Sequence, residues 1–152
     1  MVDRRSALVF VISLVATFVA CTRAPEARSR FFSSFSARDV IEKSFDSPKG
    51  GEGFRVSGGE TSVLLGSRRM YHRDDRAELS ISLSNEHSFL QRIKEHLEQQ
   101  LQIDGCKTAD AGSGEGNYSI AYTDGRVQGW IDIWGLRGPG DTYRLVITTT
   151  EN

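Results

Sequence analysis

The sequence predicts a single α+β domain, in which helices pack on one face of an antiparallel sheet in the order α-β-β-α-β-β-β. Three observations lead to this prediction. Apolar residues recur at helical spacing between residues 86 and 102, several other segments alternate apolar and polar residues as strands do, and an Asp-Gly pair separates two of those segments. A chain of 152 residues has room for one such core, and a second domain is not expected.

The first 21 residues have the composition of a secretory leader. Residues 1–5 form a short basic head, and an apolar run of 15 residues follows, from 6 to 20. This run is shorter than the roughly 20 residues that a membrane-spanning helix needs. We therefore expect residues 1–20 to be a signal peptide.

The end of this leader resembles that of bacterial lipoprotein precursors. Val19-Ala20-Cys21 is similar to the lipobox of that family, although Phe18 stands where the family usually has an aliphatic residue. The resemblance covers only the first 21 residues. It implies cleavage before Cys21, a diacylglyceryl thioether on Cys21 and a location in the cell envelope. Thr22 after Cys21 is not an acidic retention signal, which favours the periplasmic face of the outer membrane in a Gram-negative cell. An uncleaved anchor and an unlipidated secreted protein remain the alternatives.

Residues 22–37 are rich in serine, arginine and alanine and show no sustained period, which predicts a flexible tether. The domain is then expected to span residues 38–152. Phe31, Phe32 and Phe35 are unusual in a free linker, so part of the tether is expected to pack onto the domain.

The first half of the domain is expected to contain one helix and two strands. A short helix begins after Ser36 as N-cap and continues to about Phe45, where the Pro/Gly-rich residues 48–53 end it. Residues 61–65 and 77–83 have strand character. The connection between them is either a loop or a continuation of both strands to a tight turn at Asp74-Asp75.

The clearest helix follows, with Ser84 or Asn85 as N-cap and an end near Gln102, where Gly105 is a natural stop. Its apolar stripe consists of Phe89, Leu90, Ile93, Leu97 and Leu101. Residues 107–116 are rich in glycine, alanine, serine and aspartate and predict a mobile loop.

The last third predicts a hairpin around Asp124-Gly125 and a third strand after the turn at 138–140. A two-residue turn would pair Tyr122 with Val127, Ile120 with Gly129 and Tyr118 with Ile131. The expected core face contains Tyr118, Ile120, Tyr122, Val127, Ile131 and Ile133, and in the third strand Tyr143, Leu145 and Ile147.

Trp130 and Trp134 fall on the opposite face, together with Arg144. Two indoles on a polar sheet face offer large, rigid surfaces for a sugar ring, a peptide or a protein partner. The alternative is that the first helix, or Phe31, Phe32 or Phe35, covers them as a second small core.

A second candidate is the basic cluster formed by Arg68, Arg69, His72, Arg73 and Arg76, which has the chemistry to grip a phosphate or carboxylate. Asp74 and Asp75 lie inside the same segment and would neutralise much of its field. A solvated, charged hairpin is the alternative interpretation.

Composition excludes some classes of function. The formal charge of −1 becomes about −2 without the leader, so no overall positive field favours nucleic acid. Lipidation of Cys21 leaves Cys106 unpaired, and we expect it to be a small buried side chain. His87 and His96 are nine positions apart and cannot share a metal as an i, i+4 pair does, so no metal or cofactor is expected.

These observations favour a membrane-anchored, non-enzymatic binding domain. Its partner is expected to be an envelope protein, a wall glycan or lipid, met through Trp130, Trp134 and Arg144. Two alternatives remain open. One is a small periplasmic enzyme that uses His72 with Asp74 or Asp75, and the other is an accessory subunit of an envelope complex.

Overall fold

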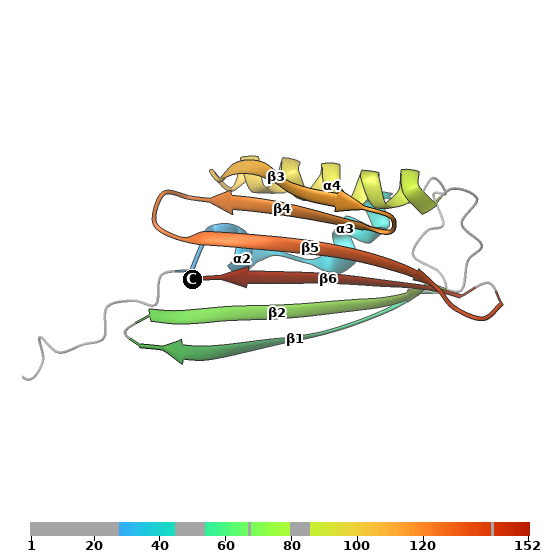
Figure 1. The fold of residues 1–152 in the computed structure, drawn as a ribbon, viewed down its shortest axis with the longest axis horizontal. Coiled ribbons are helices and arrows are strands. Elements are labelled where there is room, and N and C mark those ends of the chain that lie inside the picture. The colour runs from blue at the N-terminus through green and yellow to red at the C-terminus, as the bar shows by residue number, and fades with distance from the viewer. Residues whose placement is uncertain (1–27, 45–53, 67, 80–85, 141) are drawn as a thin grey trace, which may run out of the picture.

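The computed structural model describes residues 28–44, 54–66, 68–79, 86–140 and 142–152. These residues form one sheet of six strands, all antiparallel, and three helices (Figure 1). The strand order is β1-β2-β6-β5-β4-β3, so the prediction of an α+β chain with an antiparallel sheet is confirmed. In chain order the elements are α2 (Arg30–Ser34), α3 (Ala37–Ser44), β1 (Phe54–Leu65), β2 (Arg68–Leu79), α4 (Glu86–Ile103), β3 (Lys107–Gly114), β4 (Asn117–Thr123), β5 (Gln128–Arg137) and β6 (Tyr143–Glu151).

The order differs from the predicted one by an additional helix, α2, and an additional strand, β3. The prediction of a mobile loop at 107–116 is wrong, because residues 107–114 pair with β4 from Lys107 to Gly114. The register shifts between Asp110 and Gly112, where Asp110 Oδ1 accepts a hydrogen bond from the Gly112 amide at 3.2 Å. The small residues of β3 have weak strand propensity, so its pairing with β4 must hold it extended.

The described end of the predicted tether is folded. Ser29 caps α2 by accepting a hydrogen bond from the Phe32 amide at 3.0 Å, and Phe31 and Phe32 are buried. Burial of two phenylalanines stabilises by about 2 kcal/mol each, which offsets the short length of the helix. Among the described residues, the folded part therefore includes 28–37, which the prediction assigned to the tether, and Phe31, Phe32 and Phe35 are buried, as expected.

Helix α3 agrees with the sequence pattern. The Ser36 hydroxyl accepts a hydrogen bond from the Asp39 amide at 3.3 Å, as expected of an N-cap, and Val40 and Ile41 are buried. The expected end of this helix at Phe45 and the Pro/Gly-rich stop at 48–53 lie outside the described residues.

Strands β1 and β2 form a long hairpin whose turn contains Gly66, at φ +63°. Both alternatives for this connection, a loop and a tight turn at Asp74-Asp75, are wrong, because residues 68–79 form one strand with Asp74 and Asp75 in its middle. The carboxylates are tolerated there because each has a cation. Arg73 Nε donates to Asp75 at 2.8 Å, and Arg76 Nη2 donates to Asp74 at 2.8 Å. Residues 80–83 of the predicted second strand lie outside the described residues.

Helix α4 is the predicted long helix, and all five residues of its apolar stripe are buried. It ends in a Schellman motif, in which Cys106 N donates to Leu101 O at 2.8 Å and Gly105 N to Gln102 O at 3.0 Å. Gly105 has φ +83°, a conformation that glycine adopts without strain. The predicted caps, Ser84 and Asn85, lie outside the described residues.

The β4–β5 hairpin has the predicted faces but a different register. Tyr122 pairs with Gly129, Ile120 with Ile131 and Tyr118 with Ile133, two residues beyond the predicted partners. The loop is longer than a two-residue turn because Asp124 Oδ1 accepts hydrogen bonds from the amides of Arg126 and Val127, both at 2.9 Å. Since side chains alternate with a period of two, a shift of two leaves every residue on its predicted face.

The hydrophobic core combines the buried side chains of the helices with alternate residues of the strands. Every residue of the predicted core face of β4, β5 and β6 is buried. The strand members of the core are Ala77, Leu79, Tyr118, Ile120, Tyr122, Ile131, Ile133, Tyr143, Leu145 and Ile147.

Candidate functional site

The candidate site lies on the sheet face that we call the open face, defined by Trp130, Asp132 and Trp134 on β5. Strand register places small or polar side chains beside both tryptophans. Trp130 is flanked by Ala121 and Thr150, and Trp134 by Asn117 and Val146. Because these neighbours are short, the two indoles stand above the surface around them.

Both indoles are accessible to solvent: Trp130 is 40% exposed and Trp134 is 50% exposed. Phe31, Phe32 and Phe35, which were the alternative cover for the two indoles, lie elsewhere. Phe31 and Phe35 belong to the core cluster, and the Phe31 ring contacts the ring of Tyr122 at 5.4 Å between centroids. The first predicted helix, α3, also buries its apolar residues in that cluster, so neither segment covers the tryptophans.

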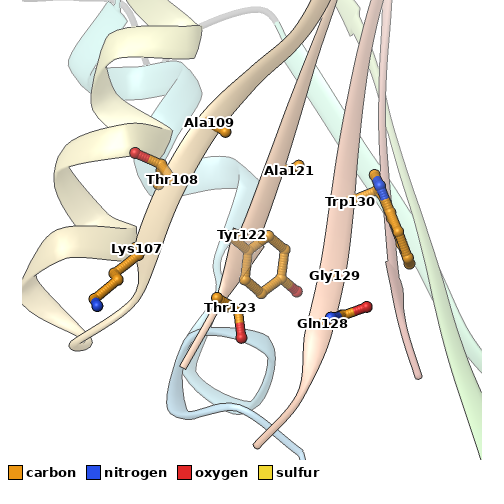
Figure 2. A pocket seen from close by; sticks show the side chains of 9 residues that line it. All are labelled: Lys107, Thr108, Ala109, Ala121, Tyr122, Thr123, Gln128, Gly129 and Trp130. Atoms are coloured by element: carbon orange, nitrogen blue, oxygen red, sulfur yellow. The ribbon is translucent and has the colours of Figure 1, made fainter. Parts of the chain in front are cut away.

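A hollow of about 300 Å³ lies beside Trp130. It exists because Ala109 and Ala121, on neighbouring strands, have the smallest side chains of this part of the face. Figure 2 shows Lys107 on one side of the hollow and Trp130 and Gln128 on the other. The hollow therefore combines an apolar floor and one aromatic wall with a cation and an amide.

Asp132 lies between the two tryptophans and is partly exposed. Ser119 Oγ donates a hydrogen bond to Asp132 Oδ1 at 2.5 Å from the neighbouring strand. Among the described residues, Asp132 has no ion pair with an arginine or lysine, so its second oxygen is available as an acceptor.

Asp74 on β2 lies on the same face, two strands away from Asp132. Its carboxylate accepts hydrogen bonds from Arg76 and, at 3.0 Å, from Thr148 Oγ1. The hydrogen bond with Arg76 is the main cause that holds the pKa of Asp74 below its usual value, against the opposing effect of burial. Both oxygens of Asp74 thus have partners within the protein, whereas only one oxygen of Asp132 does.

Arg144 also lies on the open face, as predicted, but not beside the hollow. It is on β6, where it pairs with Leu136 of β5 and Glu78 of β2. It lies two residues before Val146, the neighbour of Trp134. The structure therefore brings Trp130, Trp134 and Arg144 to one face, with the hollow near one end of this row and Arg144 at the other.

The predicted basic cluster is divided between the two faces of β2. Arg68 lies at an alternate position of β2 whose side chains point to the open face, whereas Arg69 and Arg73 point to the other side. Arg73 pairs with buried Asp75 and lies over the ring of Phe35, 5.2 Å from its centroid. Burial is the main cause that raises the pKa of Asp75, and the hydrogen bond from Arg73 opposes it. These arginines do not converge on a common ligand position.

His72 makes no hydrogen bond with either carboxylate of the predicted catalytic pair: its Nδ1 lies 3.1 Å from Thr150 Oγ1. Asp74 shares the face of His72 but is hydrogen-bonded to Arg76 and Thr148, and Asp75 is on the opposite face. His87 contacts the Tyr118 hydroxyl and His96 contacts Ser44, so each is a partner in local packing. Within the ranges that the structure describes, no group of three histidine, cysteine or acidic side chains is placed to hold a metal ion.

Sequence reasoning missed a buried carboxylate, Glu151. It accepts hydrogen bonds from the Tyr122 hydroxyl at 2.6 Å, from the Ser29 amide at 3.1 Å and from the Ser29 hydroxyl. This contact fastens the segment before α2 to the end of β6. The strict alternation of β6 puts Glu151 on the core face with Tyr143, and that was the available signal.

Cys106 is a free, buried thiol, as the sequence predicts. Burial is the main cause that raises its pKa to about 11. No family model matches the chain, and no curated protein or solved structure matches it either.

Proposed function

We propose that this chain is a lipid-anchored envelope protein whose small domain binds an envelope component through its open face. Trp130, Trp134 and Arg144 form the working face, and no catalytic step is assigned to it. In this proposal the helices occupy one face of the sheet and leave the opposite face for the ligand. The support is that buried helix residues cluster with the strand residues that alternate with the tryptophans.

The anchor rests on the leader alone. Its basic head, its apolar run and Val19-Ala20-Cys21 are the features that favour lipidation of Cys21. Two or more acyl chains are needed for stable attachment, and a diacylglyceryl group supplies two. In the described parts of the chain, no helix has the length and hydropathy needed to cross a bilayer.

The observation that carries the binding role is the exposure of both tryptophans of the chain on one face, beside a hollow. A domain of this size buries its large aromatic side chains where it can, and here Phe31, Phe32 and Phe35 are buried while the indoles are not. Exposed aromatic groups that are rigid and have a polar atom are typical anchors for ligands.

The anchor is tested by the intact mass of the N-terminal peptide from membrane-extracted protein, compared with the Cys21→Ser variant. We expect a peptide that begins at an acylated Cys21 and is absent from the variant. An unmodified peptide that retains Met1, or begins elsewhere, would refute the anchor.

The binding face is tested by cosedimentation of the detergent-purified full chain with washed, lipid-extracted envelopes of the producing cell, so that the acyl anchor has no bilayer to enter. We expect Trp130→Ala and Trp134→Ala to abolish cosedimentation and to leave the urea midpoint nearly unchanged. Ile103→Ala, at an exposed position on α4, is the control. Loss of cooperative unfolding in the tryptophan variants would assign these residues a structural role and refute the proposal.

A further inference from the structure

The geometry of the open face points to a polysaccharide chain as its ligand, lying along β5 with sugar rings against Trp130 and Trp134. This inference rests on the proposed binding role of that face and names the class of ligand. It is carried by the spacing of the indoles, the carboxylate between them, and the hollow at one end.

The two indoles form a row rather than a single spot. They are four residues apart on one strand, which separates them by roughly 13 Å at about 3.3 Å per residue. The neighbours Ala121 and Thr150 are short, so a chain can lie beside the row without meeting bulky side chains. A ligand that contacts both indoles must therefore be extended and must present more than one flat apolar face.

Sugar rings meet this requirement because each ring has an apolar C–H face and a rim of hydroxyl groups. The C–H face packs on an indole, and the hydroxyl groups need acceptors. Asp132 supplies such an acceptor between the indoles, because Ser119 occupies one of its oxygens and no cation of the described residues pairs with it. Hydrogen bonds to an ionised acceptor are the strong ones, and this one fixes the position of the chain between the two stacking sites.

The hollow supplies a place for a ring beside Trp130. Its floor is Ala109 and Ala121, and Lys107 and Gln128 lie at its sides, where they can donate hydrogen bonds to hydroxyl or acyl oxygens (Figure 2). The combination of a flat wall, a small apolar floor and polar sides fits a substituted ring.

The same features disfavour a protein partner. A protein surface docked over the tryptophans would have to bring its own cation to Asp132, because burial of the carboxylate without one costs several kcal/mol. Hot spots of protein interfaces are also surrounded by residues that exclude water, whereas the neighbours here include Ser119, Thr148 and Thr150. A glycan leaves the carboxylate hydrogen-bonded and partly hydrated.

The test uses the detergent-purified full chain, whose two tryptophans both report on this face by fluorescence. The probes are a glycan array and two soluble tetrasaccharides, of β-1,4-linked N-acetylglucosamine and of β-1,4-linked glucose. We expect saturable binding to at least one glycan. Trp130→Ala, Trp134→Ala and Asp132→Ala should each lower the affinity by about tenfold or more, whereas Ile103→Ala should not change it.

Two matched substitutions separate stacking from general apolar contact. Trp130→Phe keeps a flat ring, whereas Trp130→Leu keeps apolar area without one. We expect the phenylalanine variant to retain most of the affinity and the leucine variant to lose it. Equal affinities of these two variants, or no glycan bound by the unmodified chain, would overturn the inference.

Failure of the glycan inference can be distinguished from failure of the proposed function. Tryptophan-dependent cosedimentation with the lipid-extracted envelopes, without binding to any glycan, would retain the binding face and assign it a protein ligand. Cosedimentation that does not depend on Trp130 or Trp134 would remove the binding face itself.

Discussion

The buried carboxylate of Glu151 offers the sharpest test of how the first described segment is held. Replacing it by alanine removes the acceptor of three hydrogen bonds, from the Tyr122 hydroxyl and from the amide and hydroxyl of Ser29. A buried donor left without a partner costs about 1–3 kcal/mol. The Ser29 hydroxyl can turn to other acceptors, so two donors lose their partner, and we expect Glu151→Ala to destabilise the domain by about 2–6 kcal/mol. That is a large part of the roughly 5–15 kcal/mol that stabilises a typical domain.

The measurement is urea denaturation of Glu151→Ala, Tyr122→Phe and the double variant. Both single changes break the same hydrogen bond, so the double-mutant cycle should be non-additive by about 0.5–3 kcal/mol. Glu151→Gln keeps one acceptor oxygen and should fall between the parent and Glu151→Ala. Amide exchange at Phe32 should accelerate, because the cap that Ser29 provides depends on the same contact. A cost below about 1 kcal/mol with an additive cycle would refute the reasoning.

Three further predictions follow from single contacts. Gly129→Ala should destabilise by about 1–3 kcal/mol, measured by urea denaturation, because its Cβ would lie 2.5 Å from the hydroxyl of Tyr122; a neutral effect would show that the ring moves at no cost. Cys106 should react with iodoacetamide about 100-fold more slowly than an exposed cysteine at pH 8, since its pKa is raised to about 11 from 9.0, and urea should abolish this protection; equal rates in native and unfolded protein would contradict its burial. The lowered pKa of Asp74 means that its contribution to stability is present above its ordinary value of 3.8 and is lost as the pH falls through the lower folded value. Arg76→Ala removes the hydrogen bond that is the main cause of the lowered pKa of Asp74. The loss of stability in acid should therefore be smaller in this variant, in denaturation measured between pH 2 and 5, and an unchanged pH profile would argue against this cause.

Hydrophobic alternation predicted the faces of the sheet more reliably than it predicted the pairing. The expected turn at Asp124 used two residues, but the side chain of Asp124 accepts two backbone hydrogen bonds and widens the loop. A hydrophobic pattern with a period of two cannot detect the resulting shift of two residues in the pairing. For the same reason the placement of Trp130 and Trp134 on one face followed from sequence, whereas their exposure and their cross-strand partners did not.

Features that depend on distant partners were not predictable from local pattern. The composition of residues 107–116 indicates a loop, and only pairing with β4 makes most of that segment a strand. Asp74 and Asp75 resemble a turn, and the ion pairs that keep them within β2 cannot be read from spacing alone. The hollow beside Trp130 likewise requires Ala109 from the strand that the sequence did not reveal.

The position of β6 in the sheet affects the order in which the sheet can assemble. This strand is the last in chain order among the described elements, yet it lies between β2 and β5. Until it has been made, no strand is available to join β2 to β5, so a β1–β2 hairpin and a β3–β4–β5 meander would have no backbone pairing between them. Both pieces then present an unpaired inner strand, which is the kind of edge that recruits other chains.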